Sequence, residues 1–91
     1  MLKERHFDKK KVGEFYIQVL AENLKNIRDH FDLSQEALAE ASQMSVNEVS
    51  KIERGIINPG LTTLVALAKG LGLDIGTLLT PDLDVSKLNP P

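Results

Sequence analysis

Apolar residues recur three or four positions apart along most of the chain, and no segment shows the alternation of a strand. From Val12 to Phe31 this spacing predicts one long helix over about residues 11–30. The same pattern predicts four further helices, over about residues 35–42, 46–54, 61–71 and 75–79. The tail after Pro81 has no strong period. We therefore expect an all-α protein without a β-sheet.

Start and stop signals bracket the predicted short helices. Ser34, Ser45 and Asp74 are favourable N-cap residues, and Glu48 follows Ser45 at the spacing of a capping box. Gly55 and Gly72 stand where a helix commonly ends in a left-handed residue. The helix that begins after Ser45 is therefore expected to be short.

Composition narrows the class of protein. The 91 residues, 42% of them hydrophobic, suffice for one small domain with its own core. There is no cysteine, and the two histidines, His6 and His30, have no neighbouring ligand pattern, so we expect no metal and no cofactor. Every apolar run is far shorter than the roughly 20 residues of a membrane span, which predicts a cytoplasmic protein without a membrane partner.

The charge is unevenly distributed. The net charge is −2, but residues 1–11 hold five cations against two anions, a local charge of +3 that leaves −5 for the remainder. This basic start is a solvated terminus or an arm that follows a DNA backbone, and for the N-terminal residues as a whole an extra dimer or partner surface competes with the arm; the residues leave these interpretations open. Apolar residues at 12–20 predict a helical extension packed on the body. We expect an arm and extension over 1–20, a domain over 21–80 and a tail over 81–91.

The second and third predicted helices form a pair joined by a tight turn. Ala39 is small enough to let two helices cross closely, and Leu38, Met44, Val49 and Ile52 can fill the wedge between them. This is the spacing of a helix-turn-helix, whose second helix can enter a DNA major groove.

The segment from Leu24 to Leu79 carries ordered motifs, "LSQEALA", "SVNEVSKIERG", "NP" and "TLVALAKGLGLD". On these motifs it resembles the phage repressor and Cro family of helix-turn-helix proteins, the lambda-repressor-like domains of XRE-type regulators. The resemblance implies a five-helix DNA-binding domain that regulates transcription, as a repressor, by binding a palindromic operator as a homodimer. Two departures concern the turn, where Ser42 and Gln43 replace a large apolar residue and a glycine, and the loop after Gly55, which is apolar at Ile56 and Ile57.

The third helix has two faces of different character. Val49 and Ile52 share the inward face with a carboxylate, Glu53. Arg28 is the cation on the apolar side of the first helix, so we predict that Arg28 and Glu53 pair across the core, as the family also does. A pair of this kind sets the angle at which the third helix projects rather than adding stability.

The outward face of the third helix is the predicted reading surface. Val46, Asn47, Ser50 and Lys51 are expected to meet base edges: Asn suits adenine, Lys suits guanine, and Val46 can pack on a thymine methyl group. The residues expected to contact phosphate are Gln35, Ser45, Arg54 and Asn58.

Apolar residues near the end of the sequence bear on how the chain assembles. Leu78, Leu79, Leu83 and Val85 offer more apolar surface than a short last helix can bury, which predicts a dimer interface there. No nucleophile is paired with a base, so we do not expect an enzyme.

The alternative function is a protein-interaction module, such as an antitoxin or an inhibitor of another regulator.

Overall fold

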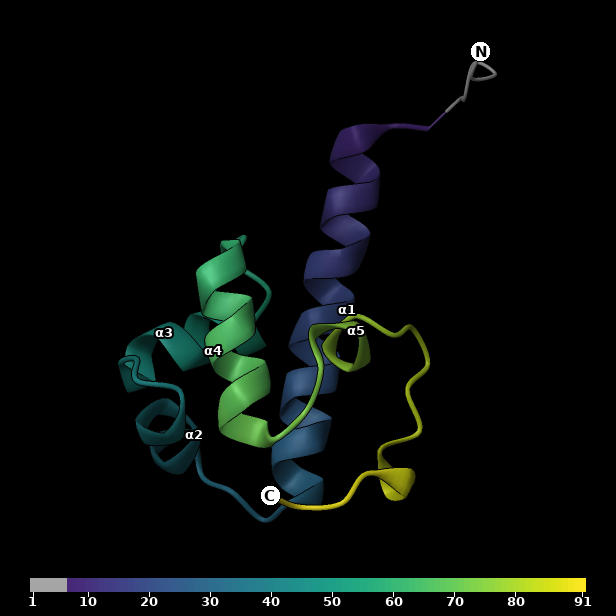
Figure 1. Cartoon of the computed structure of the whole chain (residues 1–91). Coiled ribbons are helices and arrows are strands. Elements are labelled where there is room, and N and C mark those ends of the chain that lie inside the picture. The colour runs from purple at the N-terminus through teal and green to yellow at the C-terminus, as the bar shows by residue number, and fades with distance from the viewer. Residues whose placement is uncertain (1–6) are drawn as a thin grey trace.

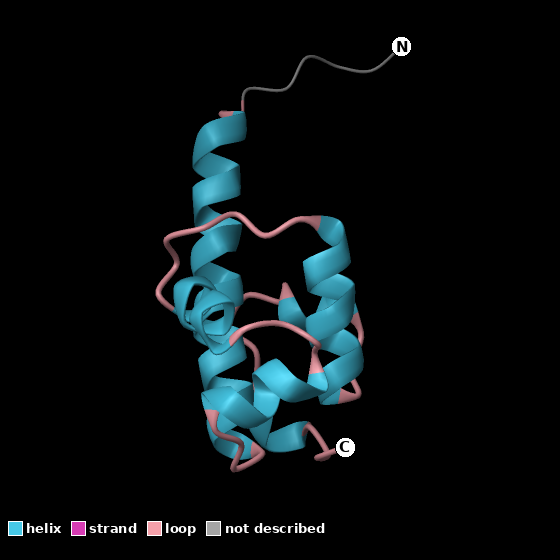
Figure 2. Cartoon of the chain, turned by 90° about the vertical axis from the view of Figure 1, so that its left-hand side faces the viewer, coloured by secondary structure: helices cyan, strands magenta, loops and turns pink. Residues whose placement is uncertain are grey.

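The computed structural model describes residues 7–91, which form five α-helices and one short 3₁₀ helix (Figure 1). The elements are α1 (Lys9–His30), α2 (Gln35–Ala41), α3 (Val46–Glu53), α4 (Leu61–Leu71), α5 (Ile75–Leu78) and η1 (Val85–Lys87). This described part contains no strand, and the prediction of an all-α fold is confirmed (Figure 2).

Helix α1 is one continuous element of 22 residues. Asp8 begins it by accepting hydrogen bonds from the backbone N–H groups of Lys10 and Lys11, at 2.9 and 3.3 Å. The predicted extension and the first helix of the domain are therefore a single helix, and the predicted boundary at residue 20 lies in its middle. The first turns of α1 extend beyond the rest of the molecule (Figures 1 and 2). The basic residues before Phe7, Lys3 and Arg5, lie outside the described residues.

The capping signals act largely as predicted. Ser34 Oγ accepts from Ala37 N at 3.0 Å to begin α2, and Ser45 Oγ accepts from Glu48 N at 3.1 Å to begin α3. Gly72 ends α4 at a φ of 69°. Asp74 occupies the N-cap of α5, but its side chain makes no capping hydrogen bond.

The core lies between α1, the α2–α3 pair and α4. Its most deeply buried side chains are Leu24, Ile27, Leu38, Val49, Ile52, Leu67, Leu71 and Leu78. All are aliphatic and come from five different helices, so each helix is held by the face that carries its apolar spacing. In this arrangement α3 contacts both α1 and α2, which positions it at the side of the molecule.

The tail is part of the fold although its sequence has no helical period. Leu83, Val85 and Leu88 pack against the core, and η1 contacts α1. The buried amide of Asn23 donates to the carbonyl oxygens of Leu78 and Thr80, both at 2.9 Å, which ties the end of α5 to α1. Because both carbonyl oxygens are held by one buried side chain of α1, the irregular segment after α5 lies along α1.

The prediction that residues 12–20 pack on the body is wrong for their first part. Val19 and Leu20 are buried, but Val12, Phe15 and Tyr16 are 41%, 53% and 40% exposed. The physical reason is the direction of α1, whose first turns rise beyond the elements that cover the rest of the helix. Three large apolar side chains are therefore left at the surface.

A close approach between α4 and the end of α2 generates a stability prediction. A Cβ atom at Gly70 would lie 2.5 Å from Ser42 Oγ and 3.1 Å from the backbone carbonyl of Ala41. We expect Gly70→Ala to lower the free energy of unfolding by about 1–3 kcal/mol, because backbone as well as side chain must move. Chemical denaturation measures this change, and Gly76→Ala is the control, since nothing lies within 4 Å of its Cβ position.

The same contact makes a second prediction for Ser42. Its buried hydroxyl has no hydrogen-bond partner among the described residues. Ser42→Ala is therefore expected to preserve or raise the free energy of unfolding, by up to about 1 kcal/mol, because an unpaired buried hydroxyl costs stability. If chemical denaturation shows that Ser42→Ala lowers the free energy of unfolding by more than about 1 kcal/mol, the hydroxyl has a hydrogen-bond partner and the prediction is wrong.

Candidate nucleic-acid interface

The α2–α3 pair is joined by a turn in which the end of α2 is tightly closed. Met44 N donates to Ala39 O at 3.0 Å and Gln43 N donates to Glu40 O at 3.2 Å, the hydrogen-bond pattern of a Schellman motif. Gln43 takes the left-handed conformation, with a φ of 55°. Because this conformation costs a residue with a Cβ about 1 kcal/mol relative to glycine, the turn holds modest strain. It reverses the chain within three residues before the N-cap Ser45.

A buried carboxylate connects α3 to α1. Arg28 Nε lies 2.8 Å from Glu53 Oε2, and Arg28 Nη2 donates to Glu53 Oε1 at 3.1 Å, so the contact is bidentate. The Glu53 side chain is only 2% exposed. Its carboxylate raises the pKa of Arg28 through the hydrogen bonds, which keeps the guanidinium charged. The structure therefore brings together the two residues of the predicted ion pair.

A third residue completes this polar cluster. Gln35, the first residue of α2, donates from Nε2 to Glu53 Oε1 at 3.0 Å, while Arg28 Nη1 donates to Leu33 O at 2.9 Å. The cluster thus joins α1, the α1–α2 loop, α2 and α3. No spacing in the sequence signals the Gln35 contact, because Gln35 and Glu53 are 18 residues apart on different helices.

The opposite face of α3 is accessible. Val46 and Asn47 are exposed at the first turn of α3, and Ser50 and Lys51 are half-buried one turn later. The four side chains predicted to read bases therefore share a face of α3 that is turned away from the buried Val49 and Ile52, with Val46, seven residues before Glu53, at the edge of this face nearest Glu53. An apolar contact, an amide, a hydroxyl and an ammonium group are thus presented together.

The residues predicted to contact phosphate are placed less uniformly. Arg54 and Asn58 are exposed, at the end of α3 and in the loop that follows, and Arg54 Nε donates to Ser50 O at 3.4 Å. Ser45 is exposed but its hydroxyl already accepts from Glu48 N. The Gln35 amide is engaged with Glu53, so only its remaining hydrogen-bonding capacity is available to a ligand.

The predicted dimer interface needs correction. Leu78 is fully buried in the core, and Leu79, Leu83 and Val85 are half-buried and packed against it. Much of this apolar surface is buried within one chain because the tail packs along α1, so Leu78 cannot form an interface, while the accessible parts of Leu79, Leu83 and Val85 keep the prediction open. Ile57 is also packed against the core, and of the loop pair only Ile56 is exposed.

Residues 7–91 also bear on metal binding, on membrane insertion and on the surroundings of His30. This range holds no group of three side chains that could bind a metal ion. None of its helices combines the length and the apolar character needed to cross a membrane. His30 is exposed, and its Nε2 lies 3.2 Å from Leu88 O.

The ion pair generates the next prediction. Arg28→Ala leaves the buried Glu53 carboxylate with only the Gln35 amide, and we expect a loss of about 3 kcal/mol in the free energy of unfolding. The double variant Arg28→Met, Glu53→Leu removes both charges and is expected to regain most of that stability, because matched apolar replacement is frequently neutral. Urea denaturation of the single and double variants measures both effects. Equal stability of Arg28→Ala and the parent chain would show that the pair contributes nothing.

Comparison with known proteins agrees with this geometry. The helix-turn-helix family model matches residues 24–78. The chain is 41% identical over 63 residues to control protein C.SmaI of Serratia marcescens, covering 69% of this chain and 75% of that protein. It is 35% identical over 60 residues to the immunity repressor protein of Bacillus phage phi105, covering 66% of this chain but 42% of the repressor.

A solved structure extends the likeness to nearly the whole fold. The hypothetical transcription factor NHTF from Neisseria superposes with a TM-score of 0.71 and 29% sequence identity, over 90% of each chain. The family consists of non-enzymatic proteins, as expected for this chain. Because the family model covers more than half of the sequence, the chain belongs to the helix-turn-helix family of DNA-binding transcriptional regulators.

Proposed function

We propose that this protein is a sequence-specific repressor that binds a palindromic operator as a homodimer, with α3 in the major groove. The observation that supports this most strongly is the two-sided character of α3. One face is fixed to α1 and α2 by the Arg28–Glu53–Gln35 cluster, while the other presents polar side chains to solvent. A helix anchored on one side and accessible on the other is what docking into a groove requires.

The exposed side chains suit direct reading of bases. The amide of Asn47 can donate to and accept from adenine at once, and Lys51 can donate to guanine O6 and N7. Val46, 40% exposed at the first turn, offers an apolar contact for a thymine methyl group. Ser50 lies between them and can donate or accept. These four residues are proposed to specify the half-site.

Phosphate contacts are proposed for residues that flank the reading face. Arg54 and Asn58 follow α3 and are exposed, and Ser45 precedes it. Gln35 can offer phosphate only its remaining hydrogen-bonding capacity, since its Nε2 already donates to Glu53. With two copies on one duplex, half-site centres are expected about 34 Å apart, one helical turn of DNA.

A second candidate function rests on one exposed side chain and on charge. Ile56, 59% exposed in the loop after α3, and the net charge of −2 are suited to a protein partner rather than to phosphate. DNA binding and protein binding differ in their salt dependence. Affinity for DNA falls steeply with ionic strength because counterions are released, whereas an apolar protein contact responds little.

The proposal predicts different effects for base and phosphate residues. After selection of bound sequences from a random DNA pool, Asn47→Ala and Lys51→Ala are each expected to cost about 1–3 kcal/mol on the selected operator and to relax preference at one base pair per half-site. Arg54→Ala is expected to weaken binding to all sequences by similar factors and to flatten the salt dependence. Fluorescence anisotropy across a salt series measures both.

The control is Lys69→Ala, which removes an exposed cation in the last turn of α4, outside the helix-turn-helix. It is expected to leave operator preference unchanged. If the Asn47→Ala and Lys51→Ala variants fold normally and keep parental affinity and preference, α3 does not read the groove. The protein-binding candidate then takes first place.

A further inference from the structure

The first half of α1 carries an apolar surface that the rest of the described chain does not cover. We call Val12, Phe15 and Tyr16 the α1 stripe; they are 41%, 53% and 40% exposed. The rings of Phe15 and Tyr16 meet edge to face, with centroids 5.1 Å apart. One turn further along the same helix, Val19 is buried. The α1 stripe therefore continues, towards the N-terminus, the side of α1 on which Val19 is buried, but no other element covers it there.

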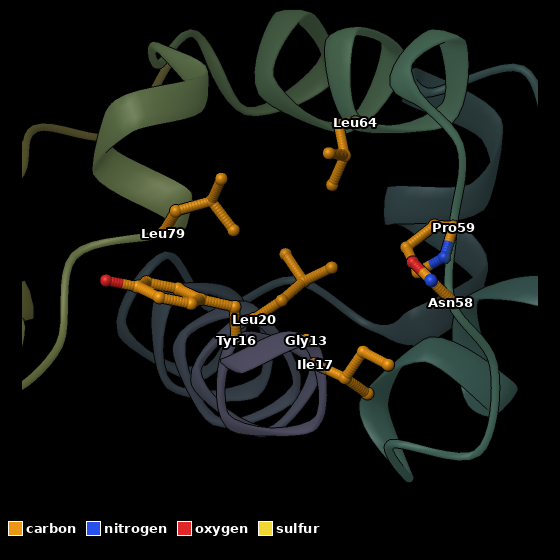
Figure 3. A pocket seen from close by; sticks show the side chains of 8 residues that line it. All are labelled: Gly13, Tyr16, Ile17, Leu20, Asn58, Pro59, Leu64 and Leu79. Atoms are coloured by element: carbon orange, nitrogen blue, oxygen red, sulfur yellow. The ribbon is translucent and has the colours of Figure 1, made fainter. Parts of the chain in front are cut away.

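A hollow opens beside the stripe. It holds about 180 Å³ and is lined mainly by apolar side chains from α1 and α4, by Leu79 directly after α5 and by the loop before α4 (Figure 3). Tyr16 and Leu20 form its floor, with Leu64 and Leu79 opposite. An apolar cavity of about 150 Å³ takes a benzene ring, so the hollow has the size of one aromatic side chain. Tyr16 is therefore the one member of the stripe that lines the hollow, and Val12 and Phe15 lie outside it.

A row of exposed residues along one side of α1 contains Phe15 and has opposite charges at its two ends, Lys11 and Glu22. Lys11, Phe15, Gln18 and Glu22 recur at intervals of four, three and four, so they run along one side of α1, and all four are exposed. Lys11 and Glu22 are separated by roughly 16 Å along the helix axis, and the midpoint falls beside Tyr16. A second α1 laid antiparallel across this midpoint brings each Lys11 to the Glu22 of the other copy. A parallel alignment brings lysine to lysine instead.

We propose that two copies of this chain associate through the first halves of their α1 helices, antiparallel about a two-fold axis near Tyr16. The Phe15 side of each stripe packs against the other copy, between the paired charges, while the hollow, on the far side of α1, stays within each chain. This assigns an interface to the homodimer of the proposed function and rests on that function for its purpose. The leucines of α5 and the tail are not assigned to this dimer interface, because they pack against the core of their own chain.

The decisive test is a charge swap measured by sedimentation equilibrium without DNA, at low ionic strength where exposed pairs contribute most. Lys11→Glu and Glu22→Lys alone each replace two symmetry-related attractions by repulsions, and each is expected to raise the dimer dissociation constant about tenfold. The double variant Lys11→Glu, Glu22→Lys restores both attractions and is expected to return the constant to near its parental value. Restoration of this kind requires a second copy in the antiparallel arrangement.

An apolar variant gives an independent readout. Phe15→Glu is expected to yield a monomer of unchanged helicity by circular dichroism, since Phe15 is half exposed within one chain. Leu61→Glu is the matched control: Leu61 is 70% exposed on α4, outside the stripe and the lining of the hollow, and the dimer is expected to persist. Dissociation by Leu61→Glu but not by Phe15→Glu would overturn the proposal and place the interface on α4.

The failures of the two proposals are distinguishable. A parental chain that is monomeric at all concentrations, yet binds the selected operator in an Asn47-dependent way, overturns the α1 interface and leaves DNA reading in place. A dimer that passes the charge-swap test but binds no DNA supports the interface and overturns the proposed function. A double charge variant no better than the single variants overturns the antiparallel arrangement.

Discussion

The structure depends on one buried carboxylate. Glu53 lies at the end of α3 with its side chain 2% exposed, and an ionised group so placed is stable only when it is paired. The guanidinium of Arg28 and the amide of Gln35 meet it from α1 and α2. Because a bidentate contact tolerates little rotation, the orientation of α3 relative to the other two helices is restricted. An apolar contact of equal volume would allow the helices to slide.

This constraint explains how a small core can position a helix for recognition. The aliphatic core provides cohesion but little directional information, since apolar packing is not directional. Direction comes from the polar cluster and from the turn before α3, where Gln43 at a φ of 55° holds the reversal despite its strain. The close packing of Gly70 on Ser42 adds a third restriction, because α4 lies directly on the end of α2.

Local signals made the helix-turn-helix predictable from the sequence. Ser34, Ser45 and Gly55 act through hydrogen bonds or conformations within a few residues, so their positions alone locate the ends of α2 and α3. The contact between Arg28 and Glu53 was also accessible, because each is the charged residue on an otherwise apolar helix face. Both features depend on periodicity and local chemistry rather than on how distant segments meet.

What the sequence did not reveal concerns irregular or long-range packing. The tail has no period, yet the carbonyls at Leu78 and Thr80 are held by Asn23, more than 50 residues earlier. The fully buried Leu78 was therefore mistaken for an interface residue. Conversely, residues 12–16 show helical spacing, which predicts a helix but not whether another element covers it. A helix face has the same pattern whether its partner is its own chain or a second one.

The division of surfaces follows from these contacts. The reading face of α3 lies opposite the buried Val49 and Ile52, while the α1 stripe is on the first half of α1, whose first turns extend beyond the body. The two surfaces share no residue, so a contact on one leaves the other accessible. The second half of α1 carries Arg28, and the first half carries Phe15. One continuous helix therefore connects the surface proposed for assembly to the ion pair that orients α3, and a rigid helix preserves that relation.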